Sequence, residues 1–235
     1  IGLVNYALLR LYGARGIHFT GLLGGLVNST AAVGELARRC GGQGGGAEAV
    51  ALEGMLLANV AMMARNGLIL AIFAPAALGH GWLAVGGMVS VTGWLVFRAM
   101  RQGRGTAAPE IRLAFPFSLR QALLFGALYL VLRGAVVLAE RWLGTGGFLV
   151  VAFLGGLVSS ASTTAAVATL AGQGRIGIEM AGMGVVLASM ASLLFHVPMA
   201  WLGGLRGQGL RTLARLSALT ALVGLLGLAA ERMLR

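Results

Sequence analysis

Long runs of apolar residues are the feature that most limits what this chain can fold into. Blocks of about 20 or more such residues recur along the 235 residues, and each is long enough to cross a bilayer core of about 30 Å. Only 11% of the residues are charged, against about 25% in an ordinary soluble domain. The blocks lack the short polar and apolar alternation of membrane β-barrels. The pattern predicts an all-α, polytopic transmembrane helical bundle whose first partner is the lipid bilayer.

The apolar blocks divide the chain into a series of expected helices. They cover residues 17–38, 47–73, 78–99, 117–140, 147–171, 176–203 and 208–231. Residues 1–11 look like the tail of a further membrane helix that begins before Ile1. The sequence therefore predicts about seven full spans plus a truncated first span, with a polar linker over 100–116.

The charged residues exclude several classes of function. The chain has 18 basic residues, all arginine, and seven acidic ones, all glutamate. The arginines stand at the ends of apolar blocks, where they anchor helices and set topology, so we expect no nucleic-acid partner. Ten arginines against six favour the side of the 40–46 turn and the linker as cytoplasmic. The absence of aspartate and the single Cys40 give no metal motif, and no cofactor is expected.

An unusual phrase occurs twice. Residues 21–30 read GLLGGLVNST, and residues 152–162 read AFLGGLVSSAS. A constant offset of 131 positions also aligns Glu48 with Glu179 and Arg65 with His196. This register predicts an internal duplication, with repeat 1 over 1–116 and repeat 2 over 117–235. Four expected helices separate the copies, which predicts two parallel four-helix repeats. If the first helix of each copy were re-entrant, the repeats would be inverted instead.

The stretch GARGIHFTGLLGGLVNSTAAVGELARR resembles the C-terminal membrane domain of unknown function in the MgtC/SapB-type bacterial membrane protein family. The resemblance covers most of the chain and implies a multi-pass protein of the bacterial inner membrane. It also implies an MgtC-like helical domain ahead of this one. Where the family carries acidic residues after the second Gly-Leu, this chain reads Ser159-Ser160-Ala161-Ser162. A cation site built from those acids is therefore not implied.

The repeated phrase has two compatible interpretations. Glycines let membrane helices approach closely, which makes Gly24, Gly25, Gly155 and Gly156 candidates for helix packing. We expect 17–38 to pack on 47–73, and 147–171 on 176–203, through stripes of small residues. Alternatively, the glycines let the helix unwind so that freed backbone and polar side chains line a path for a substrate.

Ionisable residues inside the spans are further candidates, because they are costly in a bilayer. They are Glu53, Arg65, Arg133 and His196. Arg65 either serves a pathway, pairs with Glu53 or extends to the interface, and His196 either serves a site or is a core histidine. Glu35 and Arg39 are expected to form a structural pair. The full candidate pathway is Asn28, Ser29, Asn59, Arg65, Ser159, Ser160 and His196.

These features favour a small-ion transporter or channel. A permanent positive charge at Arg65 would favour the passage of anions, or would gate protons, and would disfavour divalent cations. The alternative is a non-transporting accessory or structural subunit of a larger membrane assembly, and a homo-oligomer is also open. A hydrated cavity lined by both phrases would favour the transporter, and a dry core the subunit. An enzyme is not expected, because Ser160 lacks a Gly-x-Ser-x-Gly context and no aspartate exists to orient His196.

Overall fold

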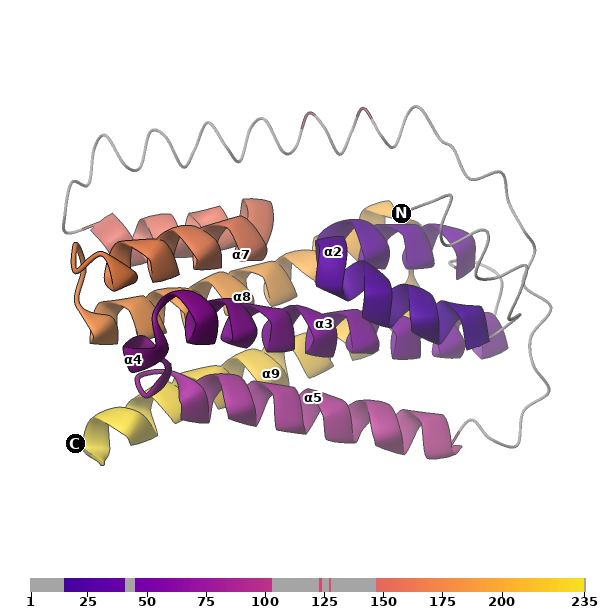
Figure 1. Ribbon diagram of the computed structural model, residues 1–235. Helices are drawn as coiled ribbons and strands as arrows, with labels where there is room; N and C mark the ends of the chain where they lie inside the picture. The colour runs from indigo at the N-terminus through magenta and orange to yellow at the C-terminus, as the bar shows by residue number, and fades with distance from the viewer. Residues whose placement is uncertain (1–14, 41–44, 103–122, 124–126, 128–146, 235) are drawn as a thin grey trace. The chain divides into compact units, whose positions relative to one another are not determined.

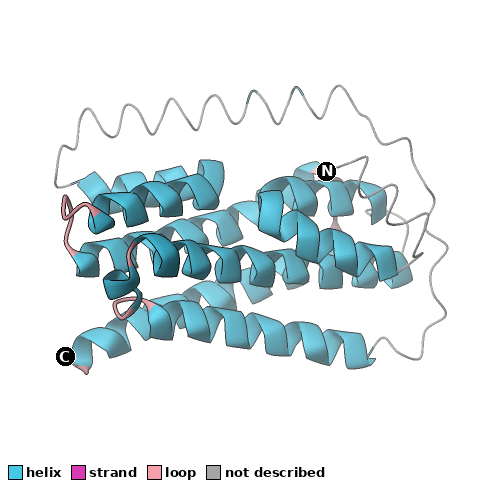
Figure 2. Ribbon diagram, viewed as in Figure 1, coloured by secondary structure: helices cyan, strands magenta, loops and turns pink. Residues whose placement is uncertain are grey.

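The computed structural model describes residues 15–40, 45–102, 123, 127 and 147–234. This part of the chain is helical and contains no strand (Figures 1 and 2), so the all-α prediction is confirmed for it. The helices are α2 (Arg15–Cys40), α3 (Gly45–Phe73), α4 (Pro75–Leu78), α5 (Trp82–Gln102), α7 (Phe148–Gly172), α8 (Ile178–Leu202) and α9 (Gly207–Met233). The expected helix over 117–140 and the truncated first span lie outside the described residues, apart from residues 123 and 127.

Five helices of the described part are long and apolar enough to cross a membrane, judged by length and composition. They are α3, α5, α7, α8 and α9. Large apolar side chains such as Ile72, Phe97 and Leu226 are exposed, as expected for helices that face lipid. Near the end of α5, Arg98 lies over the ring of Trp94 and Arg101 over that of Phe97. Such basic and aromatic pairs are typical of helix ends at a membrane interface, so the chain is a membrane protein.

Helix α2 is folded back on itself. Asn28, in its middle, has φ −154° and ψ 94°, which are not helical values. A Cβ atom added to Gly24 would lie 2.7 Å from the Cβ atom of Ala32, although eight residues span about 12 Å in a straight helix. Ile17 and Leu36, near opposite ends of α2, both contact the space beside Gly54 of α3. The helix is therefore a hairpin of two short arms that meet at Asn28.

Helix α7 has the same shape, with its break at Ser159 (φ −163°, ψ 102°). A Cβ atom added to Gly155 would lie 2.7 Å from Oγ1 of Thr163, again eight residues away. Phe148 and Val167, from the two arms, both contact the space beside Gly184 of α8. Figure 1 draws α2 and α7 each as two short helical stretches rather than as one rod.

The helices expected over 17–38 and 147–171 are therefore not single straight rods, although α7 is long and apolar enough to cross a membrane. Each arm of about 12 residues is about 18 Å long, which is shorter than a bilayer core of about 30 Å. The cause of each break is one residue. That residue leaves the helical conformation, and its side chain caps the helix that follows. The count of arginines on the two sides of the membrane assumed that these helices cross it as straight rods. The cytoplasmic side is therefore not assigned from that count.

The described residues form two compact units, and the division passes through the middle of α3, α5, α8 and α9. The first unit takes its described residues from 1–62, 89–117 and 193–220, and it contains α2. Its core includes Leu36, Ala51, Met55, Ala200 and Leu213. The second unit takes its described residues from 63–88, 118–192 and 221–235, and it contains α4 and α7. Its core includes Leu70, Ala77, Val167, Ala181 and Val185.

The helices α3 and α8, which the offset of 131 makes equivalent, run in opposite directions. In the second unit, Asn66 of α3 bonds Ser189 of α8, and the later residue Leu70 shares a core with the earlier residue Val185. In the first unit, Asn59 bonds His196, while the earlier Ala51 shares a core with the later Ala200. Parallel repeats would place equivalent helices in the same direction, which differs from the contacts of α3 and α8.

Candidate functional site

The second arm of α2 begins at a capping residue inside apolar sequence. The Asn28 side-chain Oδ1 accepts a hydrogen bond of 3.0 Å from the backbone N–H of Ala31, which is the geometry of a helix N-cap. Ser29 and Thr30 form the first turn of this arm and are buried, with exposed fractions of 4% and 6%. Backbone N–H groups at a helix N-terminus carry a partial positive charge. The hairpin therefore brings the positive end of a helix to its tip.

The second arm of α7 begins in the same way. Oγ of Ser159 accepts a hydrogen bond of 3.3 Å from the backbone N–H of Ser162 and donates one of 3.0 Å to its Oγ. Ser160, the next residue, is buried. Asn28 and Ser159 are 131 positions apart, so the two breaks and the two caps occupy the same place in the two copies.

In the first unit, the cap region of α2 lies beside a buried histidine. Nδ1 of His196 lies 2.6 Å from Oδ1 of Asn59, and its Nε2 lies 3.5 Å from Oγ1 of Thr30. His196 and Asn59 are both fully buried. The first turn of the second arm thus faces a titratable side chain that comes from α8.

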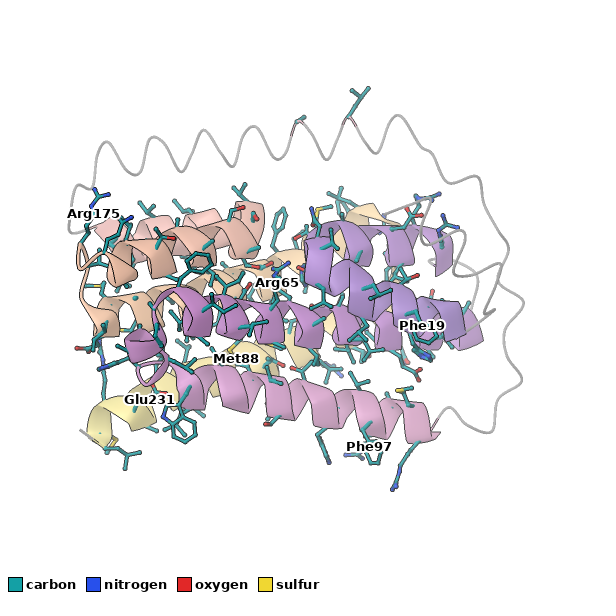
Figure 3. All side chains as sticks on the ribbon, viewed as in Figure 1. Phe19, Arg65, Met88, Phe97, Arg175 and Glu231 are labelled. Atoms are coloured by element: carbon teal, nitrogen blue, oxygen red, sulfur yellow. The ribbon has the colours of Figure 1, made fainter. Side chains whose placement is uncertain are left out.

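In the second unit, the cap region of α7 lies beside an arginine. Figure 3 labels Arg65, which α3 carries. Its Nη2 donates a hydrogen bond of 3.3 Å to Oγ of Ser160. Its Nε and Nη2 also donate to Oδ1 of Asn66, at 3.3 and 3.2 Å. The amide Nδ2 of Asn66 donates in turn to Oγ of Ser189, which donates to the carbonyl of Val185. A fixed positive charge is thereby held at the first turn of the second arm.

Arg65 and His196 are equivalent in the duplication, and their surroundings match. Each contacts the first turn after the break in the hairpin that belongs to the other copy. Of the seven candidate pathway residues, Asn59 and His196 come together in the first unit, while Arg65 and Ser160 come together in the second. Asn28, Ser29 and Ser159 form the breaks and caps beside these groups.

The glycines of the repeated phrase lie against the neighbouring helix. A Cβ atom on Gly25 would lie 2.6 Å from Cα of Ala58, and one on Gly156 would lie 2.8 Å from the carbonyl carbon of Ala188. Gly24 and Gly155 instead face the opposite arm of their own hairpins. The expected stripe on α8 is displaced, because Gly182 contacts the backbone of His80 rather than α7.

The remaining ionisable candidates have other partners. Glu53 pairs with His18 of α2 at 2.7 Å, rather than with Arg65 as one interpretation expected. Glu35 binds Arg38 at 2.8 Å and Arg39 at 2.6 Å, in agreement with the structural pair expected from their spacing. Arg133 lies outside the described residues.

A cavity of about 150 Å³ opens in the second unit, at the level of the α4–α5 turn. It is lined by His80, Glu179, Met183, Leu228, Glu231 and Arg232. None of the candidate pathway residues lines it, and Oε1 of Glu231 accepts a hydrogen bond from the backbone N–H of Leu83. This cavity is separate from the hairpin breaks.

Sequence reasoning did not select Thr30, Asn66 or Ser189. The signal for Asn66 was present, because Asn59 and Asn66 are seven residues apart on one helix face and are both fully buried. Their partners on α8, His196 and Ser189, are also seven residues apart. Two buried amides on one stripe of an apolar helix indicate a polar contact with a neighbouring helix.

Comparison with known proteins shows the family. The family model of a domain of unknown function (DUF4010) matches residues 1–204, so the chain belongs to that family. An uncharacterized protein of Aquifex aeolicus (strain VF5) is 36% identical over 89 residues, which are 38% of this chain and 39% of that protein. The chain thus matches about two fifths of the length of this relative. No solved structure matches the chain. The match supports a membrane domain of unknown function and does not by itself link the chain to MgtC/SapB proteins.

Proposed function

We propose that this member of the DUF4010 family carries a small anion across the membrane, as a transporter or channel, past its two broken helices. One observation carries the proposal: both hairpins break at equivalent positions, and each second arm begins beside a basic residue from the other copy. Broken helices whose half-helix N-termini point at anionic groups are typical of secondary transporters.

The position of the breaks supports a polar path. Non-helical backbone within a bilayer is tolerated only where protein buries it or where it lines a water-filled cavity. Asn28 is exposed and Ser159 is half-buried, although apolar sequence surrounds both. Exposed capping groups at the tip of a hairpin are better satisfied by water or a polar solute than by lipid.

The charges favour an anion over a cation. Arg65 carries a permanent positive charge, and the two half-helix N-termini add partial positive charges of about +0.5 each. The chain has no aspartate that could offset them, and the described partner of Glu53 is His18. A divalent cation would meet the same charges as a barrier.

The topology that we propose is an inverted duplication. The opposite directions of α3 and α8 and the two hairpins favour an axis in the membrane plane, as in many transporters built from inverted repeats. We also propose the bacterial inner membrane as its location, on the ground of the resemblance of its repeated phrase to MgtC/SapB-type proteins. No catalytic step is assigned to it.

The test is ion flux in proteoliposomes that contain the purified protein. Chloride, nitrate and phosphate are compared with Na⁺, K⁺ and Mg²⁺, in the native protein and in Arg65→Gln. Hydrogen bonds to charged groups are worth about 1.5–3 kcal/mol, so Arg65→Gln should lower the apparent anion affinity by about tenfold or more. The matched control is Arg101→Gln, because Arg101 is an exposed arginine over the ring of Phe97.

Anion flux that depends on Arg65 and not on Arg101 supports the proposal. Folded protein that passes none of these ions contradicts it and leaves the accessory-subunit alternative. Cation flux that is unchanged by Arg65→Gln would contradict the choice of an anion.

A further inference from the structure

His196 is a titratable side chain held by two neutral polar groups in the first unit. Its Nδ1 lies 2.6 Å from Oδ1 of Asn59, and its Nε2 lies 3.5 Å from Oγ1 of Thr30. His196 and Asn59 are fully buried, and Thr30 is 6% exposed. The equivalent position in the other copy holds Arg65, whose charge is permanent.

These partners suit both protonation states of the imidazole. An amide oxygen only accepts hydrogen bonds, so with the Asn59 amide assigned this way Nδ1 carries a hydrogen in either state. In the neutral ring, Nε2 accepts from the hydroxyl of Thr30. In the protonated ring, Nε2 donates to that hydroxyl oxygen. The gain of one proton therefore requires only rotation of a hydroxyl hydrogen.

Asn59 adds an observation that points to a ligand. Its Nδ2 is buried and has no hydrogen-bond partner among the described residues. A buried donor of this kind costs free energy unless an acceptor reaches it. Water or an anion that reached Asn59 would supply that acceptor.

Several of the charged and titratable groups on the elements of this unit have described contacts. On α2 and α3, His18 pairs with Glu53, and Glu35 pairs with Arg38 and Arg39. Glu48 lies beside Gly209, at the start of α9. The others are Arg98 and Arg101 on α5, Arg206 in the turn before α9, and Arg211 and Arg215 on α9. On α8 itself, His196 and Glu179 are the ionisable residues, and Arg65 follows Asn59 by six positions on α3.

We propose, on the basis of the proposed function, that His196 is the proton-binding residue of this transporter and that its protonation promotes anion binding. Nε2 of the neutral ring takes one proton from a hydronium ion, whose O–H bond breaks to leave a water molecule, and the ring becomes an imidazolium. The two equivalent positions then carry two positive charges in place of one. Arg65 has a permanent charge, whereas the charge of His196 depends on whether it has bound a proton. Anion uptake is therefore coupled to the binding of a proton.

The first test detects the proton without requiring transport. The chain has three histidines, so imidazole NMR spectra of labelled protein contain three side-chain signals, which His18→Gln and His80→Gln help to assign. We expect the remaining signal, that of His196, to titrate between about pH 5 and 8. Thr30→Val removes a described partner of Nε2 and should change this titration, whereas Thr92→Val should leave it unchanged.

The second test measures anion flux as a function of pH. Native protein should take up more anion as the pH falls, by up to about tenfold per pH unit where His196 titrates. His196→Gln should abolish this dependence, and His196→Arg should give high uptake at every pH. His18→Gln and His80→Gln should retain the native dependence, because the described partner of His18 is Glu53 and His80 lines the separate cavity of the second unit.

The outcomes separate the two proposals. Anion flux whose pH dependence survives His196→Gln overturns the proton site and leaves the proposed function standing. A His196 signal that does not titrate between pH 5 and 9 also overturns it, even where His196→Gln fails to fold. Absence of flux from the native protein overturns the proposed function, while the NMR titration still decides whether His196 binds a proton.

Discussion

Arg65 donates a hydrogen bond from Nη2 to Oγ of Ser160, across 3.3 Å, at the first turn of the second arm of α7. Asn66 accepts from the same guanidinium and links it to Ser189. The charge is therefore fixed in place by neutral groups. Variants that change the charge of this network without changing its shape should affect transport more than folding.

Asn66→Asp is the sharpest variant of this kind. The new carboxylate has nearly the shape of the amide and lies at the position where Oδ1 now accepts from Arg65, so it should offset the positive charge. We expect anion uptake in proteoliposomes to fall by at least about tenfold, with thermal stability in detergent within a few degrees of the native value. Asn59→Asp, in the first unit, should raise the pH at which uptake begins to fall. Full anion uptake by Asn66→Asp would show that the Arg65 charge does not act on the anion.

The two capping residues can be exchanged between the copies. Asn28→Ala and Ser159→Ala each remove the acceptor of a backbone N–H at the break, and each should cost about 1 kcal/mol of stability. Asn28→Ser and Ser159→Asn place the residue of one copy in the other and should retain most of the stability, because both residue types cap helices well. Thermal unfolding in detergent checks this. Equal losses in the alanine and exchange variants would contradict a capping role.

The glycines against the neighbouring helix should not tolerate large side chains. In Gly25→Leu and Gly156→Leu, the new side chain would meet the backbone of Ala58 or Ala188, which cannot move without separating two helices. Overpacking of this kind costs about 1–3 kcal/mol or more, so both variants should show much lower yields of folded protein. Gly86→Leu is the matched control, because a Cβ atom there meets nothing within 4 Å. Monodisperse size-exclusion peaks for all three variants would argue against these contacts.

Topology can be checked with a membrane-impermeant thiol reagent. In a Cys40→Ser background, single cysteines replace Gly46 at the start of α3 and Arg175 before α8, both of which are exposed. Inverted repeats place these two positions on opposite sides of the membrane, whereas parallel repeats place them on the same side. A third cysteine at Arg206, after α8, should be labelled from the same side as Gly46. Labelling of Gly46→Cys and Arg175→Cys from one side only would restore the parallel topology.

The sequence predicts much of this arrangement because the bilayer restricts the choices. Apolar blocks predict the long helices, and the offset of 131 pairs Arg65 with His196 before any contact is known. The packing of α2 on α3 follows from small residues at helical spacing, since Gly21 meets Gly54 and Gly25 meets Ala58. These features depend on amino-acid composition and on the spacing of residues along the chain, and both can be read directly from the sequence.

The hairpins and the inversion could not be predicted in the same way. A straight helix and a hairpin of two arms have the same composition, and they differ in the backbone of one residue, Asn28 or Ser159. The available signal was a capping residue in the middle of an apolar run, which also suits an ordinary polar contact between helices. The inversion that we propose depends on the hairpins, because one hairpin per copy leaves three of its four expected helices as crossings.

The contacts at Arg65 and His196 also bear on how such a protein could have arisen. Each hairpin is completed by a side chain from the other copy, and the helices that carry these side chains point in opposite directions. A polypeptide that consisted of one copy could not complete its own hairpin. Under the inverted duplication that we propose, it would need a second molecule inserted upside down beside it, so an unduplicated ancestor would have been an antiparallel dimer whose subunits enter the membrane in both orientations. Fusion of two such genes would have fixed one orientation for each half and freed Arg65 and His196 to diverge.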